Sequence, residues 1–478
     1  MKKCLALTAL VLAVLIAASC VLTAPAAKSQ DGVAYSLRTI SGSEDAARGI
    51  DVSVYNAGLN CLEWRTDYPV GGEPDTDFRF CFGGVHSIDN YSDTSVYLGT
   101  SLNSGVSSTD EITMEDIRSA SYGTSMPAGA VEDAITAAAG RSGTVRLRLR
   151  DYYEYYPLDI YVGLDNVFAG TPDGPVNACW GDDDYFKQAL RRAFRIPVPE
   201  DVFLDVALTY TAGVLTDIST EVENDGDIYI SSSAVETTEG LYFAVQVSYS
   251  GERTEKPDTS LLPGGGEGIF FVPMRSEAGM RVLDETGLKN VYPFDGGEEF
   301  ISLEADETAL LIVHGANERV SLSVMDREKM EQLQSVPLGK GGEDVWYTRT
   351  LASDGLRVYI FSDNSFTAVS GRAGEYSAVL TGTMPETLYL DYQNADAAWD
   401  GSRLAIGSVM TYYEDEDGVR RNYTQYSTDF TLAVFSDEGT LFYGEYYSSL
   451  GTQSYPTQPP YGKCCRMMDF SLGFGRAV

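Results

Sequence analysis

Short segments with alternating apolar and polar residues recur through the second half of the chain, and several begin at an acidic turn. In "AAWDGSRLAIGS", residues 397–408, Asp400 and Gly401 form a dipeptide typical of tight turns. Leu404 and Ile406 follow, and their spacing places both side chains on one face of a β-strand. The segment therefore predicts a hairpin.

One acidic residue followed by apolar residues four and six positions later occurs four times, at Glu239, Asp306, Asp354 and Asp400. The last three recur at intervals of 48 and 46 residues. A second strand–turn–strand pattern follows each copy, so each unit predicts four antiparallel strands. A period in the forties with four strands per unit is typical of the blades of a β-propeller.

The segment "EADETALLIVHGANERVSLSVMDREKMEQLQSVPLG", residues 304–339, resembles the YVTN-type or lactonase-type β-propeller repeat. That repeat runs from an acidic turn through an apolar strand and a short loop to a "V-x-V-x-D" strand and a last strand that leaves the wheel. The proline of the repeat's turn is absent from all four copies. The resemblance covers about residues 235–450 and implies an architecture rather than an activity.

We therefore predict an all-β chain whose residues 33–478 form a β-propeller, with seven blades expected and six or eight as alternatives. A regular β-sandwich is the competing fold, but it does not explain paired turns at this period. Small helical insertions are expected at the amphipathic run 182–194 and at the run 128–140, which ends at a glycine. To close the ring, strand 33–40 should lie close to residues 466–472.

The N-terminus has the pattern of an export signal. Lys2 and Lys3 precede an apolar run that is too short for an ordinary membrane-spanning helix. The run ends in "AASC", which resembles the lipobox of bacterial lipoproteins and implies acylation of Cys20. Residues 1–19 are then the signal peptide and residues 20–32 a tether, with the membrane contacted through the lipid at Cys20. Cleavage after "APA", which would release a freely secreted protein, is the alternative. Both place the mature chain outside the cytoplasm.

The net charge bears on the possible partners, and the cysteines bear on possible disulfides. Lys and Arg number 34 against 70 Asp and Glu, a net charge of −36. This excess argues against nucleic acid as a partner, because phosphate contacts need basic residues. Cys61 and Cys81 could form a disulfide in an oxidising compartment, whereas the adjacent Cys464 and Cys465 have poor geometry for a mutual one.

Catalytic and metal-binding patterns are weak. The chain has only two histidines, His86 and His314, and no G-x-S-x-G motif, so a histidine-based triad is disfavoured. With 70 acidic residues, a glycosidase pair cannot be distinguished from surface charge. Residues 221–232, "EVENDGDIYISS", resemble a calcium loop in part, but Ser232 replaces the final Glu, which favours a hairpin turn. We predict no catalytic residues, no metal and no cofactor.

Three segments are candidate contact surfaces. The basic residues Lys187, Arg191, Arg192 and Arg195 are best explained as a solvated helix face that pairs with nearby acids. The five tyrosines of residues 151–161 could form an aromatic platform for sugars or peptides, or could pack within the fold. The third segment is the long link at residues 411–428. We expect a partner site there, formed by the exposed side chains of Tyr412, Tyr413, Tyr423 and Tyr426.

These patterns favour a non-catalytic extracellular binding or scaffolding propeller whose partner is a protein or a glycan. The alternative is an extracellular hydrolase or lyase that acts on sugar or lactone substrates on the same scaffold. A solute-binding lipoprotein with two α/β lobes is disfavoured, because regularly alternating helices are absent from the pattern.

Overall fold

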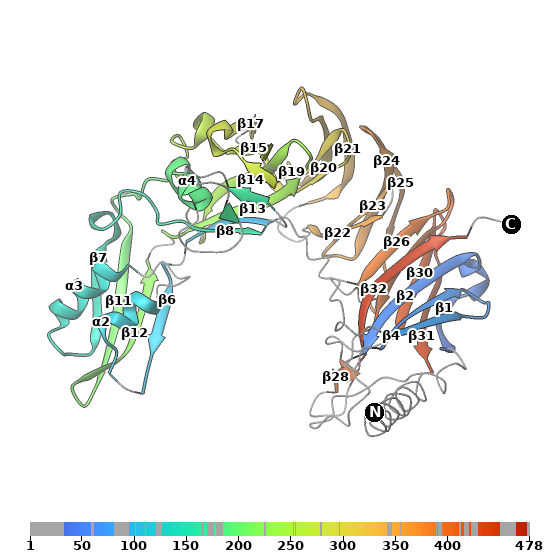
Figure 1. Cartoon of the computed structure of the whole chain (residues 1–478), viewed down its shortest axis with the longest axis horizontal. Coiled ribbons are helices and arrows are strands. Elements are labelled where there is room, and N and C mark those ends of the chain that lie inside the picture. The colour runs from blue at the N-terminus through green and yellow to red at the C-terminus, as the bar shows by residue number, and fades with distance from the viewer. Residues whose placement is uncertain are drawn as a thin grey trace, which may run out of the picture. The chain divides into compact units, whose positions relative to one another are not determined.

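The computed structural model is mostly β-structure (Figure 1). It describes residues 33–58, 62–80, 95–100, 102–109, 111–120, 127–163, 167–169, 176–177, 185–223, 226–251, 253, 255–277, 280–295, 297–341, 347–353, 355–388, 390, 394–410, 413–414, 420–421, 429–449 and 465–475. The chain divides into two compact units, which are described separately. One comprises residues 1–90 and 338–478, and the other residues 91–337.

Among the described residues, the unit formed by both chain ends contains three antiparallel sheets of four or five strands. One is a meander of β22 (Tyr347–Ser353), β23 (Leu356–Phe361), β24 (Ser365–Arg372) and β25 (Glu375–Thr383). The next holds β26 (Ala395–Trp399), β27 (Leu404–Val409), β30 (Phe430–Ser436) and β31 (Gly439–Ser448), with β1 (Tyr35–Gly42) added outside β31. The third has the order β32 (Cys465–Phe474), β2 (Ile50–Gly58), β3 (Leu62–Pro69) and β4 (Asp75–Phe80). A short 3₁₀ turn, η2 (Glu44–Ala47), joins β1 to β2.

Strands from the two chain ends pair twice in this unit. β1 runs antiparallel to β31, from the pair Tyr35–Ser448 to the pair Gly42–Phe442. β2 runs antiparallel to β32, from Ile50–Phe474 to Gly58–Cys465. The predicted meeting of the chain ends is therefore confirmed, although the partner of the first strand is β31 rather than residues 466–472. The number of blades and the closure of a ring stay predictions.

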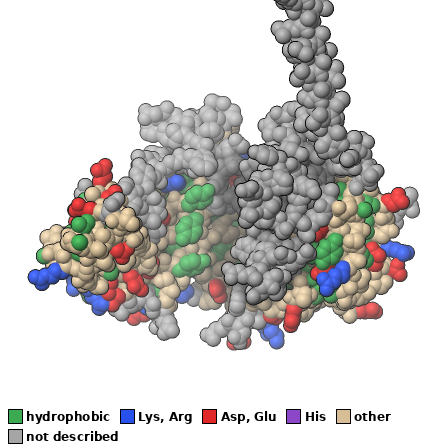
Figure 2. Space-filling view, turned by 90° about the horizontal axis from the view of Figure 1, so that it is seen from below, with side chains coloured by type: hydrophobic (Ala, Val, Ile, Leu, Met, Phe, Trp, Pro, Cys, Tyr) green, Lys and Arg blue, Asp and Glu red, His purple; other side chains and the backbone are tan. Residues whose placement is uncertain are grey.

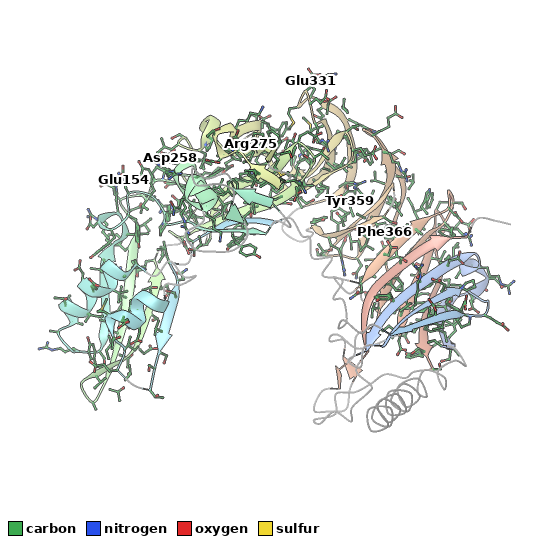
Figure 3. The ribbon with its side chains drawn as sticks, viewed as in Figure 1. Glu154, Asp258, Arg275, Glu331, Tyr359 and Phe366 are labelled. Carbon is green, nitrogen blue, oxygen red and sulfur yellow. The ribbon has the colours of Figure 1, made fainter. Side chains whose placement is uncertain are left out.

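Aromatic residues fill the core between the two sheets that hold the chain ends. Phe430 is fully buried, and its ring stacks on Tyr446 with centroids 4.7 Å apart. Tyr35 from β1 and Phe470 from β32 contact the same ring, at 5.1 and 5.8 Å. A second core joins the β22–β25 sheet to its neighbour, where Phe366, labelled in Figure 3, meets Phe435 edge-on at 5.0 Å.

Two further meanders lie within residues 228–340, and the first of them has the four strands of the predicted repeat. One has the order β18 (Glu299–Ala305), β19 (Ala309–Ala316), β20 (Arg319–Asp326) and β21 (Gln332–Lys340). The other contains β13 (Ile228–Glu236), β14 (Gly240–Tyr249), β15 (Gly268–Glu277) and β17 (Lys289–Pro293). The 3₁₀ turns η4 (Pro263–Gly265) and η5 (Glu285–Gly287) lie in its links. Here the predicted second hairpin is wrong, because β16 (Met280–Leu283) and β17 both pair with β15 and not with each other.

The rest of the unit of residues 91–337 is less regular. A four-stranded sheet has the order β6 (Ser104–Ser107), β12 (Val214–Val222), β11 (Phe203–Thr211) and β7 (Gly143–Arg148). The unit also contains the shorter elements α2 (Met114–Ala120), α3 (Ala128–Ala138), α4 (Tyr185–Ala193) and η3 (Leu149–Asp151), and the paired strands β5 (Ser95–Gly99) and β8 (Asp159–Gly163). Two further short strands, β9 (Val167–Ala169) and β10 (Val176–Asn177), extend the sheet of β13–β15 beyond β16. Both predicted helices are confirmed as α3 and α4. The sequence pattern did not predict the β6-β12-β11-β7 sheet that accompanies α2 and α3.

Aspartate marks the turns because its side chain completes their hydrogen bonding. Asp400 Oδ1 accepts from the backbone N–H groups two and three residues later, at 2.8 and 2.7 Å. Asp306 Oδ1 does the same between β18 and β19, at 2.7 and 2.6 Å. The carboxylate thus satisfies donors that the ladder leaves open. The turn prediction is confirmed at these positions and at Glu239, between β13 and β14, whereas Asp354 lies outside the described residues.

The links between the second and third strands differ in length as expected. Asn317 and Glu318, both at positive φ, make a tight connection between β19 and β20. In the Asp400 unit the link runs from β27 to β30 and carries a small pair of strands, β28 (Tyr413–Glu414) and β29 (Arg420–Arg421). In the described part of the chain, no helix has both the length and the apolar character needed to cross a membrane.

Candidate binding surface

Three adjacent strands of residues 91–337 expose tyrosine side chains. The exposed fractions are 51% for Tyr97 on β5, 56% for Tyr161 on β8 and 58% for Tyr229 on β13. They make up half of the six large hydrophobic side chains that are exposed among the described residues. Figure 2 shows a row of hydrophobic side chains on the underside of the region that carries β8 and β13 in Figure 1. We call these three residues the tyrosine face.

The alternation of β-strands explains why these tyrosines share a face. The residues on both sides of each tyrosine belong to one hydrophobic core: Val96, Leu98, Ile160, Val162, Ile228 and Ile230. Because successive side chains of a strand point to opposite faces, the tyrosines point away from that core. β5 and β8 are paired with Tyr97 directly opposite Tyr161, and β5 also runs beside β13. The core on one side thus holds the tyrosine face in place.

A glycine and a carboxylate lie next to the paired tyrosines. A Cβ atom on Gly99 would lie 2.5 Å from the Tyr97 hydroxyl oxygen, so the Tyr97 ring lies over the glycine backbone. Gly99 pairs with Asp159, which is two residues before Tyr161 and on the same face of β8. The Oδ2 atom of Asp159 is buried and accepts no hydrogen bond from the described part of the protein.

The tyrosine run of residues 151–161 serves mostly to hold the fold. Tyr152 donates a hydrogen bond to Asp133 at 2.7 Å, and burial together with this contact raises its pKa to about 12. Tyr156 is buried, which raises its pKa, and its hydroxyl donates to the Gly226 carbonyl. Tyr155 lies under the Arg195 guanidinium, 5.5 Å from ring centroid to Cζ. Of the five tyrosines in this run, Tyr161 alone belongs to the tyrosine face.

Basic residues of α4, and Arg195 just after it, contact other parts of the protein. Arg191 Nε donates to the Leu158 carbonyl at 3.1 Å, and Arg195 Nε donates to the Arg192 carbonyl at 3.1 Å. Lys187 is only 8% exposed. These hydrogen bonds of the two arginines go to backbone carbonyls rather than to the acids expected from the sequence. Phe186, Leu190 and Phe194 form the buried face of the helix, as predicted.

Residues 221–232 are not a hairpin, which corrects the sequence-based interpretation. β12 and β13 lie in different sheets, so this segment is a connection between them. Asp227 accepts hydrogen bonds from Thr100, Asn103 and its neighbour's backbone N–H, and burial raises its pKa. Asp227 therefore ties β13 to residues 100–103. Among the described residues, no group of three or more His, Cys, Asp or Glu side chains could hold a metal ion.

Around His314, side chains that the sequence pattern does not bring together lie in the Ser–His–Glu order of a catalytic triad. His314 Nε2 and Ser323 Oγ share a hydrogen bond of 2.8 Å, and His314 Nδ1 lies 3.7 Å from Glu298 Oε1. Ser323 is only 3% exposed, because it lies on β20 and faces the neighbouring sheet. A nucleophile must reach its substrate, so this buried hydroxyl is closed to one in the structure described. No sequence motif connects the three residues, which come together through the pairing of β18 with β19 and of β19 with β20.

Several predicted site residues cannot be placed. Cys20 and the possible disulfide partners Cys61 and Cys81 lie outside the described residues. So do Tyr412, Tyr423 and Tyr426, and of Tyr413 only the backbone is described, in β28.

No protein-family model matches the chain, and no curated protein is similar to it. Among solved structures it is similar to AztD from Citrobacter koseri, with 9% identity, 68% of this chain and 97% of that chain covered, and a TM-score of 0.25. A Bacteroides uniformis protein provisionally assigned as a 6-phosphogluconolactonase has 12% identity, coverage of 64% and 77%, and a TM-score of 0.24. The N-terminal domain of Nup159 has 10% identity and a TM-score of 0.23, with 58% of this chain and 62% of that chain covered. The chain therefore spans less than two thirds of that structure. These TM-scores carry no conclusion about activity.

Proposed function

We propose that this chain is an extracytoplasmic binding or scaffolding protein without catalytic function, and that the tyrosine face is a binding surface. We further propose that its four-stranded sheets belong to a closed propeller of seven blades, or of six or eight. The observation that carries the binding function is the exposure of Tyr97, Tyr161 and Tyr229 on three adjacent strands. Tyrosine is enriched at interfaces because it offers a large, rigid apolar surface with a polar tip.

Binding to the cell envelope tests this function. The chain would be produced with Cys20→Ala, so that no lipid attaches it, and sedimented with envelopes of the producing cells. We expect it to bind, and Tyr161→Ala to bind about 10-fold more weakly, as for a central aromatic residue of an interface. Leu333→Ala is the matched control, because Leu333 is 53% exposed on β21, away from the tyrosine face. Equal binding by the two variants would argue against the proposal.

Anchoring through Cys20 is proposed from its sequence context. If Cys20 is acylated, Cys20→Ala should move the protein from the detergent phase to the medium, because its membrane attachment depends on the lipid. Equal partitioning of both forms would leave simple secretion as the explanation.

Tyr412, Tyr413, Tyr423 and Tyr426 stay a proposed second contact region. The long link that carries them joins two strands of a packed sheet, where loops often carry function.

The alternative function is an extracellular hydrolase or lyase that acts on sugar or lactone substrates. The order Ser323–His314–Glu298 favours acyl hydrolysis. The burial of Ser323 weighs against it, since a substrate would need the two sheets to separate at this point.

A further inference from the structure

We propose, resting on the binding function above, that the ligand of the tyrosine face is a neutral saccharide chain. Tyr97, Tyr161 and Asp159 would form its central subsite, and Tyr229 would extend it.

The paired tyrosines fit the apolar face of a sugar ring. Tyr97 and Tyr161 are direct cross-strand partners, and such partners have Cβ atoms about 5 Å apart. Among the described residues neither hydroxyl has a hydrogen-bond partner, and neither ring stacks on another aromatic side chain. The rings are therefore open to a flat ligand with C–H groups on its faces, which pyranose rings have.

Asp159 supplies the polar contact that a sugar needs. A pyranose carries hydroxyl donors around its edge, and Asp159 lies at the edge of the paired tyrosines. Its Oδ2 is covered and accepts no hydrogen bond from the described protein. Because Asp159 as a whole is only half-buried, we assign the contact with a ligand hydroxyl to the other carboxylate oxygen, Oδ1.

Charge and composition favour a neutral saccharide over other ligands. The net charge of −36 repels acidic polysaccharides and nucleic acids. Protein interfaces are depleted in Asp at their centres, so a carboxylate beside the central rings fits a protein partner less well. A sugar, in contrast, uses both the rings and the carboxylate.

Affinity gel electrophoresis with dextran, mannan or xylan in the gel tests the ligand class. We expect at least one of these neutral polysaccharides to retard the chain, and anionic alginate not to. Tyr161→Ala and Asp159→Asn should each raise the dissociation constant about 10-fold, as expected for central contacts. Leu333→Ala should leave it unchanged. Gly99→Ala should also weaken binding, because the new methyl group displaces the Tyr97 ring.

Circular dichroism and the melting temperature of each variant separate loss of binding from loss of fold. If none of the three neutral polysaccharides retards the chain, the saccharide proposal is overturned. Envelope binding that depends on Tyr161 but not on Asp159, without retardation by any polysaccharide, would keep the binding surface and assign it a protein partner. Absence of Tyr161-dependent envelope binding would reject the proposed function itself.

Discussion

Phe430→Ala should unfold the unit that holds both chain ends far more easily than it affects the other unit. The Phe430 ring is fully buried and contacts Tyr35, Tyr446 and Phe470, which come from β1, β31 and β32. Truncating a buried Phe to Ala costs about 3–5 kcal/mol, and each lost aromatic pair can add ~0.5–1.5 kcal/mol. We expect a loss near the upper end of the first range, because the contacted strands come from distant parts of the chain.

Urea denaturation followed by tryptophan fluorescence and circular dichroism measures this loss. Two compact units need not unfold together, so the transition of each is fitted separately. The mutation should lower the midpoint of one transition and leave the other in place. Tyr229→Ala is the control for loss of an aromatic ring, since exposed substitutions usually change stability by less than about 0.5 kcal/mol. A loss below about 1 kcal/mol for Phe430→Ala would refute the idea that this ring locks the chain ends together.

Three further expectations follow from the turns, the long link and the buried serine. Burial opposes ionisation of Asp400, but its four hydrogen bonds outweigh burial and hold its pKa below the usual range. That stabilisation is present above the unfolded pKa of about 3.9 and is lost as pH falls through the folded value. Asp400→Ala should therefore lower the free energy of unfolding by about 1–2 kcal/mol at neutral pH and by less once the pH has fallen below the folded pKa, as pH-dependent urea titrations can check. Replacing residues 412–427 with a short Gly-Ser link should leave the melting temperature nearly unchanged and weaken envelope binding; collapse of the fold or unaltered binding would contradict this. A fluorophosphonate probe should leave Ser323 unlabelled in the native protein, and labelling detected by mass spectrometry would favour the hydrolase alternative.

Local physics explains which features the sequence predicted. The acidic turns were recognisable because Asp306 and Asp400 complete their turns with their own side chains, within three residues. The helices α3 and α4 were recognisable because amphipathic spacing and a glycine stop are also local signals. The sheet that accompanies these helices was missed, since its order β6-β12-β11-β7 joins strands about 100 residues apart.

The candidate surface depends on such distant pairing to a greater degree. Tyr97 and Tyr161 belong to strands 64 residues apart in sequence, and nothing near either residue indicates that they are partners. The sequence directed attention to the tyrosine run 151–161, whose members mostly proved to be internal. It could not indicate that the last of them faces solvent beside a glycine, because exposure depends on which residues lie on both sides of the strand in the fold.

The pairing of both chain ends in one unit has a consequence for how the protein matures. Ala34 and Ser449 exchange hydrogen bonds across 415 residues of sequence. During synthesis from the N-terminus, β1 and β2 therefore cannot pair with β31 and β32 until those strands have been made. Residues 91–337 form a continuous unit and can fold in the meantime. Long-range strand pairing is slow because the loop entropy is lost before contacts compensate for it. Final assembly of the sheets that hold the chain ends should thus be the last and slowest step of folding, and it cannot occur in any nascent chain that lacks its C-terminal strand.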